Sequence, residues 1–245
     1  MNVVIQLFLY DFTKCKNPYE QMRKEIRVKE FSCVLLKNCA DPYIEKVHIL
    51  CETQEAAHYF STVTRDYSEK TVFVLVGHQP TYKEIVEYVA HTIPPNKLTC
   101  IMNADIYFNS AKDHQLIQQY LQRHHLFSLT RHEITDEHHS ICSLDTCPFT
   151  GGGSSDTFIF YTPLRENLDT SKMDFRQNLF GAEAVFMKPW ADAGYEIWNP
   201  CGDIVTLHLH QDRIHFERYA TIDNPNNAVY NLKTPLPPIP SHTDT

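Results

Sequence analysis

The first hundred residues alternate short apolar segments with longer segments of helical periodicity, and this alternation limits the possible folds more than any other feature. Short, β-rich apolar runs predict buried strands at 3–10, 46–51, 71–76 and 98–102. Helices are predicted at 19–38 and 81–91, whereas 54–64 suits a short helix or a loop. Buried strands separated by helices are typical of an α/β fold, in which helices cover both faces of a mostly parallel sheet.

The second half of the chain continues the same theme less regularly. Its predicted helices lie at 113–122 and 183–193, and its predicted strands at 126–135, 156–161, 195–198 and 204–210. Neither an internal repeat nor a long linker interrupts residues 1–220, so we expect them to form a single domain. Residues 221–245 are Pro-rich and polar, and we expect this tail to be extended and partly disordered.

Charge and cysteine content narrow the class of protein. Asp and Glu outnumber Lys and Arg by 30 to 22, whereas a nucleic-acid-binding surface has to be basic, so we expect no nucleic-acid partner. The N-terminal apolar run lacks a preceding basic region and is interrupted by Gln6 and Asp11, so we expect neither a signal peptide nor stable membrane insertion. Several of the eight cysteines lie in apolar runs, which favours a reduced, cytoplasmic protein.

The ends of the predicted strands carry the first candidate site residues. Open α/β sheets bind ligands at the carboxyl ends of their strands, and strand 98–102 runs directly into Asn103-Ala104-Asp105. In an extended segment Asn103 and Asp105 point the same way, and such an amide and carboxylate can hold Mg²⁺ or Mn²⁺. A strand end capped by its own side chain is the simpler alternative. Glu52 follows strand 46–51 at the same edge.

Two further acidic residues lie close to glycines. Asp156 follows Gly151-Gly152-Gly153, whose backbone N–H groups can approach phosphate or sugar oxygens. Glu183 opens a predicted helix just after Gly181, where it could serve as a general base toward a hydroxyl group. A surface turn and an ordinary acidic residue at a helix start are the structural alternatives.

Histidines and one arginine form the last candidate group. His208 and His210 alternate at the end of an apolar run and so face one side, as metal ligands would, although chance pairs are common among 14 histidines. Arg213 could meet phosphate oxygens or be a solvated charge. The chain lacks the G-x-x-x-x-G-K-[ST] and G-x-G-x-x-G fingerprints of P-loop and dinucleotide-binding proteins.

The order of these features resembles the Rossmann-type GT-A fold of nucleotide-sugar glycosyltransferases. The segment MNADIYFN (102–109) closely resembles a NADIYF stretch in a group of glycosyltransferases from bacteria, large DNA viruses and plants. The same resemblance is found in EIRVKEFSCVLLKN (25–38), ADPYIEKVHIL (40–50), LFSLTRHE (126–133), SSDTFIFYTPL (154–164), DAGYEIWNP (192–200) and TLHLHQDR (206–213).

The resemblance implies roles for individual residues. It makes Asp105 the ligand of a divalent metal, Mn²⁺ or Mg²⁺, together with His208 or His210. Glu183 would be the catalytic base, with Asp156 as the alternative. The implied donor-binding residues are Arg27, Glu52, Asn103, Ala104, Asp105, Gly152, Gly153 and Arg213. Residues 1–110 would form the nucleotide-binding half, and 111–220 the acceptor and catalytic half.

The function implied by the resemblance is metal-assisted transfer of a hexose or pentose from a nucleoside-diphosphate sugar, with a UDP-sugar favoured. Inversion of the sugar configuration is favoured and retention stays open, because the fold hosts both outcomes. The acceptor would be a glycan or another hydroxyl compound. The alternative is a degenerate, non-catalytic protein that binds a nucleotide sugar or glycan. Two departures favour it: Asn103 stands where GT-A enzymes usually have the first Asp of Asp-x-Asp, and Ala182-Glu183-Ala184-Val185 stands where closer relatives often carry Cys-Asp-Asn-Arg. A nucleotidyltransferase that makes sugar nucleotides is disfavoured, because residues 11–16 after the first strand contain no glycine.

Overall fold

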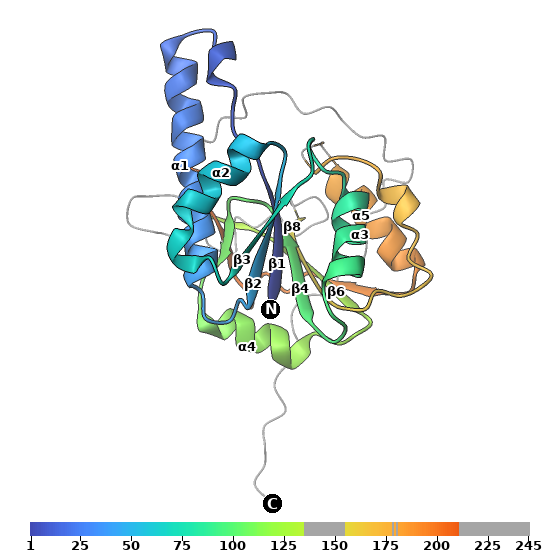
Figure 1. Cartoon of the computed structure of the whole chain (residues 1–245). Helices are drawn as coiled ribbons and strands as arrows, with labels where there is room; N and C mark the ends of the chain where they lie inside the picture. Colours follow the sequence, from blue (N-terminus) through green and yellow to red (C-terminus); the bar gives the residue numbers. More distant parts are fainter. Residues whose placement is uncertain (135–154, 178, 180, 211–245) are drawn as a thin grey trace, which may run out of the picture.

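The computed structural model describes residues 1–134, 155–177, 179 and 181–210, which form two β-sheets and the helices around them (Figure 1). The larger sheet has seven strands in the order β3 (Thr71–Leu75), β2 (Lys46–Cys51), β1 (Asn2–Leu7), β4 (Leu98–Met102), β8 (Ser155–Tyr161), β6 (His125–Thr130) and β9 (Glu196–Trp198). Only β8 runs antiparallel to its neighbours β4 and β6, and the other neighbouring pairs are parallel. The predicted mostly parallel α/β sheet is therefore confirmed.

Helices cover both faces of this sheet. The α-helices of the described residues are α1 (Pro18–Ala40), α2 (Gln54–Val63), α3 (Tyr82–Thr92), α4 (Ala111–Tyr120) and α5 (Ala182–Asp192). Short 3-10 helices occupy Phe12–Lys14, Arg65–Tyr67 and Thr170–Met173. Side-chain caps define helix starts: the Asn17 side chain accepts a hydrogen bond from the backbone N–H of Glu20, and Thr81 and Glu84 form a capping box.

The alternation of side chains along the central strands divides the core into two layers. Val3, Ile5 and Leu7 of β1 pack with residues of α1, α2 and α4 on one face. Val4, between them in sequence, points to the other face and packs with α3 and α5. Figure 1 shows the same division, with α1 and α2 on one side of the strands and α3 and α5 on the other. The period of two that marks a strand therefore decides which helix each residue meets.

The sequence did not lead us to expect the second sheet. It has three strands, β5 (Ile106–Phe108), β10 (Thr206–His208) and β7 (His132–Glu133), with β10 in the middle. The segment 126–135, predicted as one strand, is instead divided at Arg131 between the two sheets, and that prediction was wrong. The register shifts between Leu129 and Thr130, and the Asn199 side chain accepts the Thr130 backbone N–H at 3.2 Å. Pairing in the larger sheet therefore ends there.

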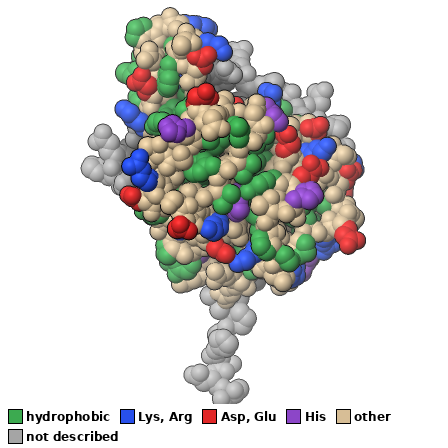
Figure 2. All heavy atoms as spheres, viewed as in Figure 1, with side chains coloured by type: hydrophobic (Ala, Val, Ile, Leu, Met, Phe, Trp, Pro, Cys, Tyr) green, Lys and Arg blue, Asp and Glu red, His purple; other side chains and the backbone are tan. Residues whose placement is uncertain are grey.

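The surface has no broad basic field on the face seen in Figure 2, where Lys and Arg side chains lie scattered among acidic and apolar ones. The first turns of α1 project beyond the rest of the fold (Figure 1) and carry Tyr19 and Met22, which are 61% and 47% exposed. Among the described residues, no helix combines the length and the apolar character that crossing a membrane requires.

The packing between the larger sheet and α5 yields a stability prediction. Phe158 is 1% exposed, and the centre of its ring lies 4.5 Å from the ring centre of Phe186 and 6.1 Å from that of Tyr82. Because the substitution leaves a cavity, Phe158→Ala should lower the free energy of unfolding by about 3–5 kcal/mol in denaturant titrations. Tyr59→Ala, at a residue 38% exposed, is the control and should change it by roughly 0.5 kcal/mol. Equal losses would contradict this account of the core.

Candidate functional site

The candidate site lies where the carboxyl end of β4 meets the small sheet. The chain leaves β4, turns through Asn103-Ala104-Asp105 and enters β5. Strand β10 runs antiparallel beside β5 with His208 opposite Ile106, and the backbone N–H of Leu209 donates to the Asp105 carbonyl at 2.9 Å. This register brings His208 to Asp105 across a sequence separation of 103 residues.

Asp105 is a buried, ionised carboxylate with two positive partners. It is 7% exposed, and its Oδ2 accepts hydrogen bonds from Nε2 of His208 at 2.8 Å and from Nη2 of Arg27. Burial alone would raise the pKa of this carboxyl, but His208 and Arg27 outweigh burial and hold the pKa well below its usual value. Asp105 is therefore ionised at neutral pH.

Arg27 reaches Asp105 from α1 and is held in place by several other groups. Its Nη1 donates to Oε2 of Glu30 at 2.7 Å and to the carbonyl of Leu209 at 3.1 Å. Its guanidinium carbon lies 4.6 Å from the centre of the Phe31 ring, a cation–π contact. The arginine side chain is only 12% exposed. These contacts fix the guanidinium against the carboxylate.

His208 bridges two carboxylates. Its Nδ1 lies 2.8 Å from Oε2 of Glu133, on the far side of the ring from Asp105. Ionised carboxylates only accept hydrogen bonds, so both ring nitrogens donate and the ring is an imidazolium. Burial opposes that charge, but Asp105 and Glu133 raise the pKa of His208 to about 9. Burial also opposes ionisation of Glu133, yet His208 and Arg131 lower its pKa to about 2.

Arg131 extends this network to the start of β8. Its Nε donates to Oε1 of Glu133 and its Nη1 to Oδ2 of Asp156, both at 2.7 Å. The other oxygen of Asp156 accepts from the Asn103 side-chain amide at 2.7 Å. Asp156 is 3% exposed and has both oxygens engaged, so it ties β4 to β8 and is poorly placed to take a proton. The complete series is Glu30, Arg27, Asp105, His208, Glu133, Arg131, Asp156 and Asn103.

Glu183 has the opposite electrostatic environment to Asp105. It lies in the first turn of α5, after Gly181, whose φ of +85° lies in the left-handed region that glycine adopts readily. Burial and the negative charge of Asp156 raise the pKa of Glu183 to about 7, although its own backbone N–H and Arg131 favour the charged form. A carboxyl group with a pKa near neutrality is well suited to proton transfer.

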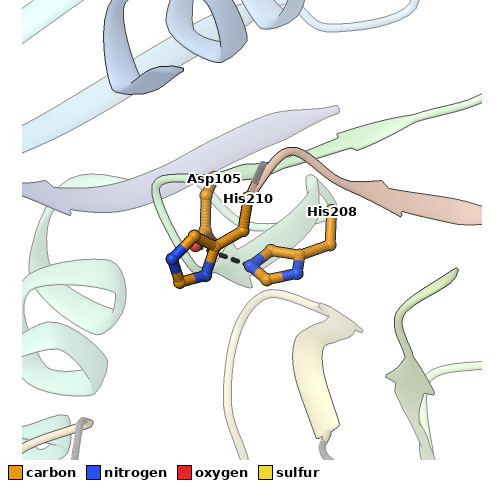
Figure 3. A group of neighbouring side chains, drawn as sticks. All are labelled: Asp105, His208 and His210. Carbon is orange, nitrogen blue, oxygen red and sulfur yellow. Dashed lines mark hydrogen bonds and ion pairs between the residues drawn. The ribbon is translucent and has the colours of Figure 1, made fainter. Parts of the chain in front are cut away.

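His210 joins Asp105 and His208 in a group that could supply three metal ligands (Figure 3). Their ligand atoms all lie within 4.8 Å of one another, and the Glu133 contact to Nδ1 of His208 is typical of a metal-binding histidine. However, Nε2 of His208 donates to Oδ2 of Asp105, and the positively charged guanidinium of Arg27 donates to the same oxygen. In this arrangement the three side chains do not fit a divalent cation.

The remaining predicted site residues lie elsewhere. Glu52 is half-buried, which raises its pKa, although Arg176 and His78 act in the opposite direction. It follows β2, which lies two strands, roughly 10 Å, from β4 in the sheet. Ala104 packs against the core. Outside the described residues lie Gly152, Gly153, Arg213 and the predicted tail at 221–245.

Sequence reasoning assigned no role to Glu30, Arg131 or Glu133. Glu30 follows Arg27 by three residues on a helix, a spacing that favours an ion pair. Arg131 and Glu133 are opposite charges two apart directly after an apolar run, so in an extended chain they face the same side. Both patterns were visible in the sequence, but neither indicated which third residue completes the network.

A second histidine–carboxylate group lies at the start of β6 and β9. His124, His125 and Glu196 also place possible ligand atoms within 4.8 Å of one another. However, Nδ1 of His125 accepts the backbone N–H of Gln122 at 3.1 Å, which leaves the proton of a neutral ring on Nε2. A neutral His125 therefore has no lone pair available for a metal.

Comparisons with known proteins do not assign a family. No protein-family model matches the sequence, and no curated protein matches it significantly. HddC from Yersinia pseudotuberculosis aligns over 71% of this chain and 78% of its own, with 12% identity and a TM-score of 0.37. A protein from Desulfovibrio desulfuricans G20, assigned as a nucleotide-diphospho-sugar transferase, aligns over 81% and 78%, with 12% identity and a TM-score of 0.49.

A third solved structure is 4-diphosphocytidyl-2C-methyl-D-erythritolsynthase from Anaerococcus prevotii DSM 20548. It aligns over 81% of this chain and 85% of its own, with 9% identity and a TM-score of 0.48. Identities and TM-scores this low assign neither a family nor an activity. The functional argument therefore depends on the site itself.

The Arg131–Asp156 pair provides a stability test of the network. Arg131→Met should lower the free energy of unfolding by about 3–5 kcal/mol at neutral pH, because it leaves the Asp156 charge without its ionic partner. The matched control is Lys97→Met, which removes a pair with Glu45 whose side chains are 40% and 49% exposed. The control should lose less than about 1 kcal/mol in the same denaturant titration. A loss for Arg131→Met as small as that of the control would rule out a structural role for Arg131.

Glu183 should make stability depend on pH. Its pKa rises from 4.5 to about 7 on folding, so the folded state binds the proton more tightly and its contribution to stability declines as pH rises through this window. Glu183→Gln removes the titration. The unfolding free energy of Glu183→Gln, relative to wild type, should increase by about 3 kcal/mol as pH rises from about 4 to 7, and the difference should then stay at that value at higher pH. A difference that is the same at pH 4 and at pH 7 would show that the pKa of Glu183 is not raised.

Proposed function

We propose that this protein is a glycosyltransferase that moves a sugar from a nucleoside-diphosphate sugar to a hydroxyl group of a glycan or another acceptor. The observation that carries the proposal is the contrast between two acidic residues. Asp105 is ionised and paired with cationic groups, whereas Glu183 has a pKa of about 7. Environments that separate the pKa values of two carboxyl groups are typical of sites that use them differently. The resemblance of residues 102–109 to GT-A glycosyltransferases supports the same function.

The position of Glu183 also supports this function. Strand β9 pairs in parallel with β6, so α5, which precedes β9, runs back across the sheet and begins at the carboxyl edge. That edge is where α/β sheets bind ligands, and it is the edge from which Asp105 emerges. The negative charge of Asp156 raises the pKa of Glu183, so the two acids are neighbours. Asp156 bonds Arg131 and Asn103.

In the proposed reaction, the bond between the anomeric carbon and the diphosphate oxygen breaks, and the leaving group departs with the electron pair. Arg27 offers positive charge and N–H donors to the developing negative charge, whereas His208, whose two N–H groups are bonded to Asp105 and Glu133, adds only positive charge. The acceptor oxygen forms the new bond to the anomeric carbon while Glu183 takes its proton. Such a single displacement inverts the configuration of the sugar. The divalent metal expected from the sequence stays a prediction, and no step of this mechanism depends on it.

A UDP-linked hexose or pentose is the donor we favour. Asn103 uses its side-chain N–H to bond Asp156, which turns its amide oxygen into the available acceptor for a ribose hydroxyl. The described cysteines are free thiols, which supports the proposed cytoplasmic location.

The alternative function is binding of a nucleotide sugar or glycan without transfer. It is favoured by the engagement of both Asp156 oxygens, by Arg131 and Asn103, and by the amide at position 103, where the GT-A motif usually has an aspartate. Only Glu183 then remains to act as the base. Donor binding is expected under both functions, so turnover distinguishes them.

The test combines binding and turnover. Thermal unfolding is measured with UDP-, GDP- and dTDP-sugars, each with Mn²⁺, Mg²⁺ or EDTA, and a donor at 100 times its Kd should stabilise by about 2.7 kcal/mol. Nucleoside diphosphate release is then measured with the stabilising donor. Glu183→Gln should keep the stabilisation and lose activity by about 10²–10⁴-fold. The matched control is Glu196→Gln, an acid 43% exposed on β9, which should retain activity.

The outcomes separate the candidate functions. Stabilisation with turnover that needs Glu183 supports the transferase. Stabilisation without turnover in the wild-type protein would leave the binding function. If no nucleotide sugar stabilises the protein, the transferase and nucleotide-sugar binding are both wrong, and only glycan binding remains of the alternative.

A further inference from the structure

The position expected for a metal ion is taken by a side chain of the protein itself. Oδ2 of Asp105 accepts a hydrogen bond from Nη2 of Arg27 and another from Nε2 of His208. A divalent cation shared by Asp105 and His208 would have to replace the proton with which Nε2 of His208 donates to that oxygen. A fixed positive charge on the carboxylate also repels a dication, and it does so most strongly where the surroundings exclude water.

Three other groups hold Arg27 in place and oppose its moving aside. Its Nη1 bonds both Oε2 of Glu30 and the carbonyl of Leu209, and its guanidinium packs on the ring of Phe31. The Glu30 side chain is 5% exposed and accepts a bond from Arg27, so withdrawal of Arg27 would remove a cationic partner from a second buried carboxylate. Two buried acids on different elements therefore share one arginine.

We propose that Arg27, and not a divalent cation, is the positive group that acts at Asp105, so that this site binds its anionic ligand without a metal ion. The anion, a diphosphate, rests on the proposed function. A guanidinium has five N–H donors in one plane, and the three bonds to Asp105, Glu30 and Leu209 use three of them. The remaining donors suit phosphate oxygens, which a guanidinium can bind in pairs.

A manganese titration tests the exclusion of metal without relying on any activity. Free Mn²⁺ is followed by electron paramagnetic resonance in the presence of the wild-type protein, Arg27→Met, Arg27→Lys and the double variant Arg27→Met/Asp105→Asn. The wild type and Arg27→Lys should bind Mn²⁺ weakly, and Arg27→Met should bind it about 10–100-fold more tightly. The double variant should lose that gain. Micromolar binding by the wild type that Asp105→Asn abolishes would overturn the proposal.

Folding of the arginine variant needs its own control, because Arg27→Met removes a cationic partner of the buried Glu30 side chain. Arg27→Met/Glu30→Leu removes both charges of that pair and should bind Mn²⁺ as tightly as Arg27→Met. Circular dichroism melting reports whether each variant is folded. The wild-type titration is decisive even if neither variant folds, since tight binding there is incompatible with the proposal.

Inorganic pyrophosphate is the probe for the anionic ligand. With EDTA present, it should raise the melting temperature of the wild-type protein, and the shift should be lost in Arg27→Met. A shift that appears only when Mn²⁺ is added would overturn the proposal. If pyrophosphate has no effect with or without Mn²⁺ while the wild type still rejects Mn²⁺, the diphosphate ligand and the proposed function are wrong, whereas the exclusion of metal by Arg27 stands.

Discussion

A buried ionised carboxylate, Asp105, is the constraint on which the arrangement of the site depends. A charge removed from water is costly unless it is paired and hydrogen-bonded, so the fold has to bring cationic groups to it. One of them, Arg27, comes from α1, and the other, His208, comes from β10. The need to pair the Asp105 carboxylate with cations therefore determines how α1 and β10 meet the loop after β4.

Each partner of Asp105 creates a similar requirement in turn. Arg27 is balanced by Glu30, and His208 by Glu133, which is itself paired with Arg131. The alternating series of charges ends at Asp156, at the start of β8. Because Arg131 stands where the chain passes from β6 to β7, the series joins the larger sheet to the smaller one. The same contacts that settle the charges also hold the two sheets in register around the site.

Glu183 lies outside this series of paired charges, and its chemistry differs for that reason. Asp105 is a buried carboxylic acid and Glu183 a partly buried one, yet the pKa of Asp105 falls and that of Glu183 rises to about 7. Paired cations outweigh burial at Asp105, whereas burial and a neighbouring negative charge dominate at Glu183. Asp105 is therefore a permanent anion that holds Arg27 and His208 in place, whereas Glu183 can exchange a proton near neutral pH.

The local pattern of the sequence determined the α/β class, the central strands and the helices, because periodicities of two and of about 3.6 residues are properties of neighbouring residues. It also indicated Asp105, His208 and Glu183, since strand ends, alternating histidines and a helix start can be recognised in short segments. The tertiary structure decided which of these residues meet. Contacts between residues far apart in the chain bring Arg27 to Asp105 and engage both oxygens of Asp156. Such contacts also divide a predicted single strand between two sheets at Arg131. Such contacts leave no periodic signal, because the energy of a buried charge depends on its surroundings in space and not on its neighbours in sequence.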